Sequence, residues 1–360
     1  MLGKKHTIHE DFMDRAIELA LNGLGKVSPN PLVGCLVVKD GEVIGEGFHR
    51  EFGSDHAEVD ACKNSSKSPS GATIYVTLEP CSIIGKTPTC TDYLISNGIR
   101  SVYIGMLDPN PSINGKGVEQ LKAAGIDVHI NILEDECREL NKGYINWQKY
   151  KRPWVIVKVA ESYDGYISKD SDTQTNITED EALAHSHKLR SQVDAIIIGR
   201  QTALTDNPRL TVRRINGPNP IRIILDTNRT LPLELNIFDN ESDTILICSN
   251  KKFNNNRMQH CQYLVCDEDD NGKLDVSKIL DLLGDIGITS LLIEGGAKVI
   301  TSFVEQNLVN EVYLYKSQSK IIEGSLKSPI IIDDWDVLDT LNLGVDSLKI
   351  ARKKELCLQE

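Results

Sequence analysis

Three metal-binding side chains from separate segments are the strongest constraint on how this chain can fold. His56 begins an H-x-E motif that ends at Glu58, and Cys81 and Cys90 follow further along the chain. One imidazole and two thiolates hold Zn²⁺ and leave its fourth position open, whereas a structural site would normally close with a fourth protein ligand. The pattern therefore favours a catalytic metal site, and the fold must bring His56, Cys81 and Cys90 together.

The residue order H-x-E and then P-C-x(n)-C is typical of zinc enzymes that hydrolytically deaminate amino-heterocycles. In such enzymes the metal lowers the pKa of a bound water to about 7. Glu58, which is not a ligand, would carry the water proton to the ring nitrogen and then to the departing ammonia. Eight residues separate Cys81 from Cys90, where the commonest pattern has two, so this segment must loop out. The alternative interpretation is that both cysteines are buried thiols and His56 is a surface residue.

Composition limits the class of protein. At 360 residues the chain is long for a single hydrophobic core, so two domains are expected. No run approaches the roughly 18 apolar residues of a membrane span, and residues 1–12 contain no apolar signal segment. A net charge of −12 argues against a nucleic-acid partner, although local arginines can still hold a small phosphorylated ligand. Nine scattered cysteines indicate free thiols in a reducing cytoplasm.

The first half of the chain alternates helix and strand patterns. Asp40-Gly41 predicts the turn of a hairpin. Expected helices cover residues 10–24, 56–62, 91–98 and 118–124. Expected strands cover residues 33–38, 43–48, 72–78, 102–106 and 126–132. A hairpin followed by strand–helix repeats implies a sheet with helices on both faces.

A domain boundary is expected within residues 144–153, because this stretch is polar and ends in Pro153. We interpret residues 146–153 as a linker between a first domain, residues 1–149, and a second domain, residues 150–360. The second domain has an α/β pattern of its own. Its expected strands cover residues 154–160, 195–198, 221–225, 244–248, 263–266, 291–293 and 311–315. Its expected helices cover residues 179–190, 276–283 and 297–307.

Several motifs of the first half occur in the order of a known family. They are residues 29–35 (PNPLVGC), 45–49 (GEGFH), 56–58 (HAE), 77–81 (TLEPC), 87–90 (TPTC) and 108–111 (DPNP). Together they closely resemble the bifunctional deaminase/reductase family of bacterial riboflavin biosynthesis, and the resemblance extends over almost the whole chain. It implies an α/β fold that joins a cytidine-deaminase-like domain to a dihydrofolate-reductase-like domain. The first would deaminate a diaminohydroxy-phosphoribosylaminopyrimidine, and the second would use NADPH to reduce the ribosyl group to ribityl.

For the first domain, the resemblance implies one zinc ion per chain. The ligands would be His56, Cys81 and Cys90, and Glu58 would be the catalytic residue. The implied substrate-binding residues are Asn30, His49, Lys86, Thr87 and Asn110. Lys86 would pair with the 5′-phosphate as a point charge. His49 has the alternative interpretation of an ordinary solvated histidine at the end of a strand.

In the second half, the resemblance is carried by residues 158–165 (KVAESYDG), 199–213 (GRQTALTDNPRLTVR) and 294–297 (EGGA). Gly199 and the glycines of EGGA lie between a strand and a helix, where backbone can approach cofactor phosphates. Taken alone, the first of these turns fits a plain strand–helix connection equally well. The implied NADPH-binding residues are Ala160, Asn176, Thr202, Asp206, Thr227, Gly296, Ala297, Lys298, Val299, Ile300, Thr301 and Ser302.

The implied substrate-binding residues of the second domain are Gln174, Arg190, Leu210, Arg213 and Glu294. Arg190 and Arg213 suit the ribose phosphate because guanidinium pairs bidentately with phosphate oxygens; the alternative for each is solvated surface charge. Asp206 is also the catalytic candidate of this domain, assisting proton movement near C1′ of the opened ribosylamine. The preference for NADPH over NADH rests on the resemblance alone.

Four residues depart from the pattern of the family. Ile83 and Ile84 occupy a loop in which the family usually has histidine, which affects the expected deaminase efficiency. Asn176 replaces a tryptophan, and Asn207 replaces the second acid of an Asp-Asp-Pro motif, which affects the expected reductase efficiency.

The expected enzyme is a cytoplasmic homo-oligomer that binds a small phosphorylated pyrimidine and neither nucleic acid nor a membrane. One alternative is a deaminase whose second domain only binds substrate or organises oligomers. A second is a deaminase of nucleic acid or free nucleosides, against which the acidic charge and the second domain weigh. A third is a zinc-stabilised scaffold without activity.

Overall fold

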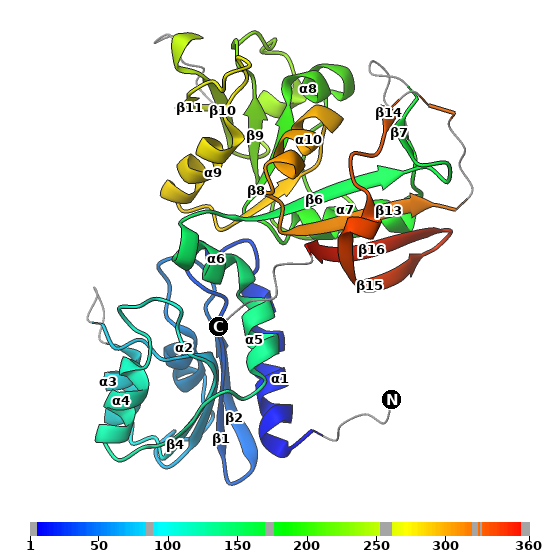
Figure 1. Cartoon of the computed structure of the whole chain (residues 1–360). Coiled ribbons are helices and arrows are strands. Elements are labelled where there is room, and N and C mark those ends of the chain that lie inside the picture. Colours follow the sequence, from blue (N-terminus) through cyan, green and yellow to red (C-terminus); the bar gives the residue numbers. More distant parts are fainter. Residues whose placement is uncertain are drawn as a thin grey trace. The chain divides into compact units, whose positions relative to one another are not determined.

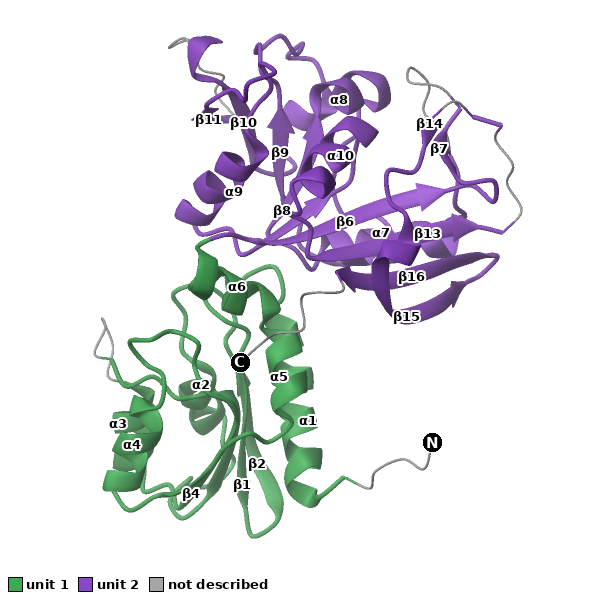
Figure 2. Cartoon of the chain, viewed as in Figure 1, with its two compact units in different colours: residues 1–151 green, residues 152–360 purple. Residues whose placement is uncertain are grey.

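The computed structural model describes residues 6–83, 89–169, 176–252, 261–318, 323–324 and 326–353. The chain divides into two compact units, residues 1–151 and 152–360, which Figure 2 colours separately. Each unit has its own sheet and its own hydrophobic core. Within the described residues, no helix combines the length and the apolar character that a membrane span requires.

Unit 1 is built on a five-stranded sheet with the order β2-β1-β3-β4-β5. Its strands are β1 (Gly34–Lys39), β2 (Glu42–Phe48), β3 (Thr73–Leu78), β4 (Ser101–Met106) and β5 (Asp127–His129). β1 pairs antiparallel with β2 and β3, whereas β3, β4 and β5 run parallel. The predicted β1–β2 hairpin is confirmed, and its turn residues Asp40 and Gly41 have φ angles of 52° and 80°.

Helices cover both faces of this sheet, as predicted. They are α1 (Ile8–Ala20), α2 (Ala57–Lys63), α3 (Cys90–Ser96), α4 (Lys116–Ala123), α5 (Glu134–Leu140) and α6 (Lys142–Tyr150), and a 3₁₀ turn, Leu21–Gly23, follows α1. Met13 of α1 and Cys137 of α5 pack on one face, where Figure 1 shows these two helices side by side. Ala61 of α2, Leu94 of α3 and Leu121 of α4 pack on the other face.

Two predictions about unit 1 are wrong. Residues 146–153, interpreted as a linker, include the second half of helix α6, in which Tyr144 and Ile145 are buried, whereas Tyr150 is exposed. This amphipathic spacing is hidden by the polar composition of the stretch. The strand expected over residues 126–132 contains only β5, because Asn131 and Leu133 have φ angles of 65° and 53°, which interrupt an extended chain.

Unit 2 is built on a nine-stranded sheet with the order β11-β10-β9-β8-β12-β6-β13-β16-β15. The strands from β11 to β13 in this order are parallel, and β16 and β15 add an antiparallel edge. Their bounds are β6 (Trp154–Glu161), β8 (Ala195–Gly199), β9 (Ile221–Leu225), β10 (Thr244–Ser249), β11 (Gln262–Cys266), β12 (Ser290–Ile293), β13 (Glu311–Ser317), β15 (Trp335–Leu343) and β16 (Asp346–Lys353). A separate pair joins β7 (Tyr166–Ser168) to β14 (Leu326–Lys327).

The helices of unit 2 cover both faces of its sheet. They are α7 (Asp180–Arg190), α8 (Arg200–Asp206), α9 (Val276–Asp285) and α10 (Ala297–Glu305), with short 3₁₀ turns at Asn236–Phe238, Asn250–Lys252 and Ile332–Asp334. Leu283 of α9 and Phe303 of α10 belong to one core, whereas Leu189 of α7 and Ala203 of α8 belong to the core on the other face. The predicted fold class, two α/β domains, is confirmed.

The sequence pattern does not predict α5, α8, β7, β14, β15 or β16. Most of β15 is exposed at the edge of the sheet, so it lacks the buried pattern from which the other strands were predicted. Helix α8 has only seven residues and begins directly after β8. The carboxyl ends of parallel β6, β8, β9 and β12 meet at one edge of the sheet, which is where ligands bind in open α/β folds.

Candidate active sites

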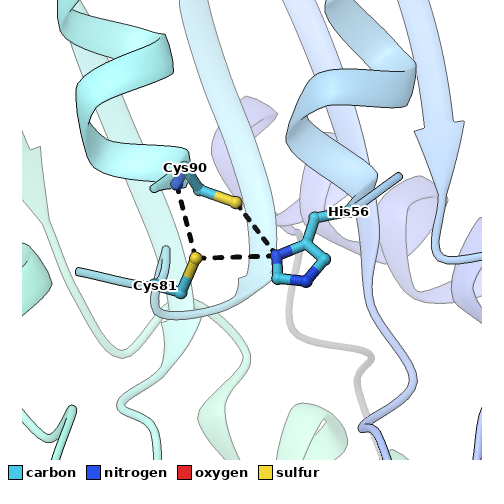
Figure 3. Close-up of side chains that lie close together, drawn as sticks. All are labelled: His56, Cys81 and Cys90. Atoms are coloured by element: carbon cyan, nitrogen blue, oxygen red, sulfur yellow. Dashed lines mark hydrogen bonds between the residues drawn. The ribbon is translucent and has the colours of Figure 1, made fainter. Parts of the chain in front are cut away.

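The three predicted metal ligands come together in unit 1. His56 is the N-cap of α2, Cys81 follows β3, and Cys90 is the first residue of α3. The Nδ1 atom of His56 lies 3.1 Å from Sγ of Cys90 and 3.6 Å from Sγ of Cys81, as Figure 3 shows. The ligand atoms all lie within 4.8 Å of one another. His56 is exposed, as the alternative interpretation held, but it lies in one cluster with both cysteines.

Local structure explains how the long insert still returns the second thiol. The Thr89 side chain accepts a hydrogen bond from the backbone N–H of Asp92, so α3 begins at Cys90. The backbone N–H of Cys90 in turn donates to Sγ of Cys81 over 3.3 Å. Ile84, Lys86 and Thr87 lie outside the described residues.

The electrostatics of the cluster fit a zinc ion. Hydrogen bonds from Cys90 and then His56 outweigh burial and lower the pKa of the Cys81 thiol to about 4. The hydrogen bond to Cys81, and then burial, raises the pKa of Cys90. The same Cys81 thiolate raises the pKa of His56 to about 9. A thiolate, a second sulfur and an imidazole nitrogen are the donor types that Zn²⁺ takes, with release of the remaining protons on binding.

Glu58 shares a cavity of about 280 Å³ with two of these ligands, His56 and Cys81. Glu58 is only 3% exposed, and burial raises the pKa of its carboxyl, which favours the protonated form. The cavity is mostly apolar, and its polar wall residues are Asn30, His49, His56, Glu58, Glu79, Cys81, Asp108, Asn110, Tyr144, Trp147 and Gln148. A carboxyl group that can hold a proton therefore lies beside the metal ligands.

His49 is a buried, neutral wall residue. It is 3% exposed, and burial lowers its pKa. Nδ1 lies 3.0 Å from the carbonyl oxygen of Asp55, which assigns the proton to Nδ1, so Nε2 accepts from Nδ2 of Asn30 at 3.0 Å. The alternative of a solvated histidine is wrong. Two predicted substrate residues, Asn30 and His49, are thus bonded to each other at the cavity.

Helix α6 supplies a wall that sequence reasoning missed. Tyr144, Trp147 and Gln148 line the cavity, and the Tyr144 hydroxyl donates to Oδ1 of Asp108 over 3.2 Å. Burial raises the pKa of Asp108 to about 6. Asp108 belongs to the DPNP motif, which was a signal for its place in the site, whereas α6 was hidden by the interpretation as a linker. Ile83 is 47% exposed and is not a wall residue.

Unit 2 contains a larger cavity, of about 610 Å³, at the carboxyl ends of its parallel strands. Of the residues predicted to bind NADPH, Thr301 alone does not line it. The wall includes Ala160, Asn176, Thr202, Asp206, Thr227, Gly296, Ala297, Lys298, Val299, Ile300 and Ser302, and also Lys158 and Glu294. Arg190, Leu210 and Arg213, predicted to bind substrate, are not wall residues, and Gln174 lies outside the described residues. Lys158, whose pKa burial lowers, was not predicted as a site residue.

Glycine is required for different physical reasons at Gly296 and Gly199, the two predicted turns. Gly296 has a φ of 69°, and a Cβ there would lie 2.9 Å from Oγ1 of Thr202. This glycine therefore permits a close approach at the cavity. Gly199 has an ordinary φ of −88°, and a Cβ there would lie 2.8 Å from Cγ2 of Val299. The contact of β8 with α10 is therefore one reason for glycine at this position. Gly199 also lines the cavity, and its role in phosphate approach stays a prediction.

Arg190 makes a bidentate ion pair with Glu294. Nε and Nη2 of Arg190 lie 2.6 Å and 2.8 Å from the two carboxylate oxygens, and the side chains are 14% and 5% exposed. Burial would raise the pKa of Glu294, but the charge of Arg190 outweighs it and holds that pKa below its usual value. The fork that was predicted to bind phosphate is therefore occupied by Glu294. Nη1 of Arg213 donates to Oγ1 of Thr211 over 2.9 Å.

Comparisons with known proteins agree with both halves. Residues 6–106 match the cytidine and deoxycytidylate deaminase zinc-binding region, and residues 153–350 match the RibD C-terminal domain. The riboflavin biosynthesis protein RibD of Actinobacillus pleuropneumoniae is 39% identical over 325 residues, which are 89% of this chain and 86% of that protein. RibD of Aquifex aeolicus is 35% identical over 355 residues, 96% of this chain and 95% of that protein.

Two solved structures cover almost the whole chain. One is a diaminohydroxyphosphoribosylaminopyrimidine deaminase/5-amino-6-(5-phosphoribosylamino)uracil reductase from Thermotoga maritima, with a TM-score of 0.87 and 36% identity over 96% of this chain and 99% of that chain. The other is RibD from Acinetobacter baumannii, with a TM-score of 0.85 and 32% identity over 97% and 99%.

The fold and sites define a zinc-type deaminase domain joined to a reductase domain. The chain belongs to the RibD family of riboflavin biosynthesis proteins, which confirms the predicted resemblance. It is a bifunctional enzyme, a hydrolytic deaminase and an oxidoreductase, and its cofactors are Zn²⁺ and NADPH. The roles of individual residues remain predictions.

Proposed function

We propose that this chain deaminates 2,5-diamino-6-(5-phosphoribosylamino)pyrimidin-4-one in a domain of residues 1–149. In a domain of residues 150–360, it then reduces the ribosyl side chain of the product to ribityl with NADPH. Deamination is supported mainly by the cavity that Glu58 shares with His56 and Cys81. For the second step, it is the unit 2 cavity at the strand ends, which is lined by the EGGA turn.

In the deaminase site, His56, Cys81 and Cys90 would hold Zn²⁺. When bound there, the metal supplies a water that is activated at neutral pH. Glu58 would pass one proton of this water to the ring nitrogen. It would then carry the second proton, from the new hydroxyl on the ring carbon, to the amino group, which leaves as ammonia when the C–N bond breaks. The place of Glu58 in the cavity beside His56 and Cys81 supports this role, and burial raises its pKa, which strengthens its hold on a transferred proton.

The other cavity walls would orient the pyrimidine. Asn30 and His49 form one bonded pair of polar groups, and Asn110 lies in the segment after β4. We propose these three as substrate-binding residues. Lys86 would bind the 5′-phosphate; it belongs to residues 84–88, which lie outside the described part of the chain.

In the reductase site, NADPH supplies the hydride that reaches C1′ of the opened ribosylamine. Gly296 and the first turn of α10 would bind the phosphates of the dinucleotide through backbone N–H groups. Asp206 is half-buried in the cavity wall, and burial raises its pKa; it would assist proton movement near C1′. Glu294 would face the substrate, and Arg190 would fix the position of the Glu294 carboxylate. Leu210 and Arg213 are also proposed as substrate-binding residues, although neither lines the cavity.

Removing the metal tests this division of labour. Treatment with a strong chelator should abolish ammonia release and leave NADPH oxidation on the deaminated intermediate unchanged, because the proposed zinc ligands all lie in unit 1. Added Zn²⁺ should restore ammonia release. No NADPH oxidation by the untreated enzyme on that intermediate would instead support a second domain that only binds substrate or organises oligomers.

We also propose that the enzyme is a cytoplasmic homo-oligomer. The location is supported by the cysteines of the described chain, which are all free thiols, as expected in a reducing compartment. Light scattering coupled to gel filtration would give the mass of the assembly, and a mass of 40.0 kDa, that of one chain, would contradict the oligomer.

A further inference from the structure

Glu79 is a buried carboxylate that the proposed chemistry does not use. It lies between β3 and the zinc ligand Cys81, and it is 3% exposed. Its Oε2 atom accepts hydrogen bonds from the backbone N–H groups of Asp108 and Gly115, at 3.1 Å and 2.9 Å. Its Oε1 atom accepts from the N–H groups of Gly117 and Val118, at 2.9 Å and 3.2 Å. One side chain therefore satisfies four backbone donors.

These donors span the segment that leads from β4 into α4. Gly115 is the N-cap of α4 and has no side chain that could accept hydrogen bonds from the first N–H groups of the helix. Glu79, which directly follows β3, accepts them instead. A negative charge at this end is also favoured by the helix dipole. A Cβ on Gly117 would lie 2.3 Å from the carbonyl oxygen of Pro80, which shows how closely α4 packs against the E-P-C motif.

The same segment forms part of the deaminase cavity. Asp108, Asn110 and Ile113 are wall residues of the segment, and Glu79 itself lines the cavity. Inside the segment, the N–H of Asn110 bonds Oδ1 of Asp108 at 2.8 Å, and Nδ2 of Asn114 bonds the carbonyl of Asp108 at 2.9 Å. The turn is therefore internally bonded, and Glu79 is its connection to the strand that leads to Cys81.

We propose that Glu79 is a positioning residue for deamination, which sets the distance between the substrate-binding turn at Asp108–Asn114 and the metal ligand Cys81. Glutamate is required because a carboxylate accepts at both oxygens. A glutamine of the same shape presents an NH₂ group to two of the four N–H donors, so about half of the connection is lost. The inference rests on the proposed deaminase function and adds a residue to it.

The test compares Glu79→Gln with the matched control Glu119→Gln, an exposed residue of α4, in the full-length zinc-loaded enzyme. We expect Glu79→Gln to retain one zinc per chain and its reductase activity. We expect its KM for the pyrimidine ribotide to rise about tenfold, which corresponds to the loss of one to two hydrogen bonds, with a smaller change in kcat. The control should match wild type in all four measurements.

A role in stability alone would lower the melting temperature without changing KM, and an unchanged KM with zinc retained would overturn the proposal. If Glu79→Gln does not fold, Glu79→Asp is used for the same test. It keeps the negative charge at the N-terminus of α4, but its side chain is one methylene shorter. The proposal then requires a raised KM with reductase activity intact, and a wild-type KM would overturn it. Absence of ammonia release by the wild-type enzyme would count against the proposed function, and not against the role of Glu79.

Discussion

The guanidinium of Arg190 holds both carboxylate oxygens of Glu294, with Nε–Oε1 and Nη2–Oε2 distances of 2.6 Å and 2.8 Å. Arg190 ends α7, and Glu294 follows β12, so the pair fixes a cavity-wall carboxylate to a neighbouring helix. Such a pair has a specific geometry as well as a charge, because a lysine ammonium cannot form the same two parallel bonds.

We expect Arg190→Lys to lower reductase kcat/KM by at least about tenfold, the effect of losing one charge-assisted hydrogen bond. Deaminase activity of the same preparation should not change. The matched control is Arg214→Lys, because Arg214 is 42% exposed and pairs with an exposed partner, Asp180. Equal reductase activity in Arg190→Lys and Arg214→Lys would contradict the positioning role of the Arg190–Glu294 pair.

Glu58→Gln separates catalysis from metal binding. The substitution keeps the shape of the side chain and leaves His56, Cys81 and Cys90 unchanged. We expect ammonia release to fall by about 10²- to 10⁴-fold, because a general acid–base group is lost, while zinc content stays at one per chain. Metal analysis and an ammonia assay on the same sample measure the two quantities. Wild-type turnover in this variant would contradict the role of Glu58, whereas zinc binding without any ammonia release by the wild-type chain would support the alternative of a zinc-stabilised scaffold.

Because His187 is buried as a hydrogen-bond acceptor, we expect its protonation to lower the stability of unit 2 at acidic pH. It is 6% exposed, and Nδ1 accepts a hydrogen bond from the N–H of Arg213 at 2.9 Å. Burial, and then the charges of Arg190 and Arg213, lower its pKa from 6.5 to about 4. Below pH 6.5 the unfolded chain therefore binds a proton that the folded chain rejects, so the stabilising contribution is lost as pH falls from 6.5 towards 4.

The measurement is the melting temperature of the reductase unfolding transition between pH 7 and pH 4.5. His187→Asn keeps an acceptor and removes the titration, so its melting temperature should fall less with pH than that of wild type. Exposed His6 provides the control substitution, His6→Asn. Parallel pH profiles for wild type and His187→Asn would show that His187 does not contribute this dependence.

Asn207 and Asn176, which both depart from the family pattern, lie in different surroundings. Asn207 has a φ of 40°, which suits asparagine, and its Oδ1 accepts from the N–H of Asn236 at 2.8 Å. It is not a cavity-wall residue, whereas Asn176 is. We expect Asn207→Asp to leave the KM for NADPH within about twofold, and Asn176→Trp to lower it by up to about fivefold, because an aromatic side chain at the cavity gains roughly 1 kcal/mol. Steady-state kinetics of both variants test this, and the opposite ranking would contradict it.

The sequence predicted best those features that a short motif or a strong period carries. His56, Cys81 and Cys90 could be predicted as one cluster because a metal site requires their convergence. Parallel strands of unit 2 such as Ala195–Gly199 could be predicted because they are buried on both faces and therefore apolar along their length.

Other features depend on contacts between distant segments and leave little local pattern. The cavity wall at Tyr144 and Trp147 lies in a polar helix, and its place becomes visible only through the bond from Tyr144 to Asp108. Arg190 and Glu294 are more than 100 positions apart in the sequence. The motif around Arg190 therefore indicates a phosphate ligand but does not reveal its pairing with Glu294. The four bonds of Glu79 are likewise long-range.

The most direct test of the account is a coupled assay of the purified zinc-loaded chain with the diaminopyrimidine ribotide and NADPH. Ammonia release and NADPH oxidation are followed separately in the same reaction. We expect ammonia to appear first, NADPH oxidation to follow after a lag, and one NADPH to be consumed for each ammonia released. Ammonia release without NADPH oxidation, or oxidation of NADPH without prior ammonia release, would contradict it.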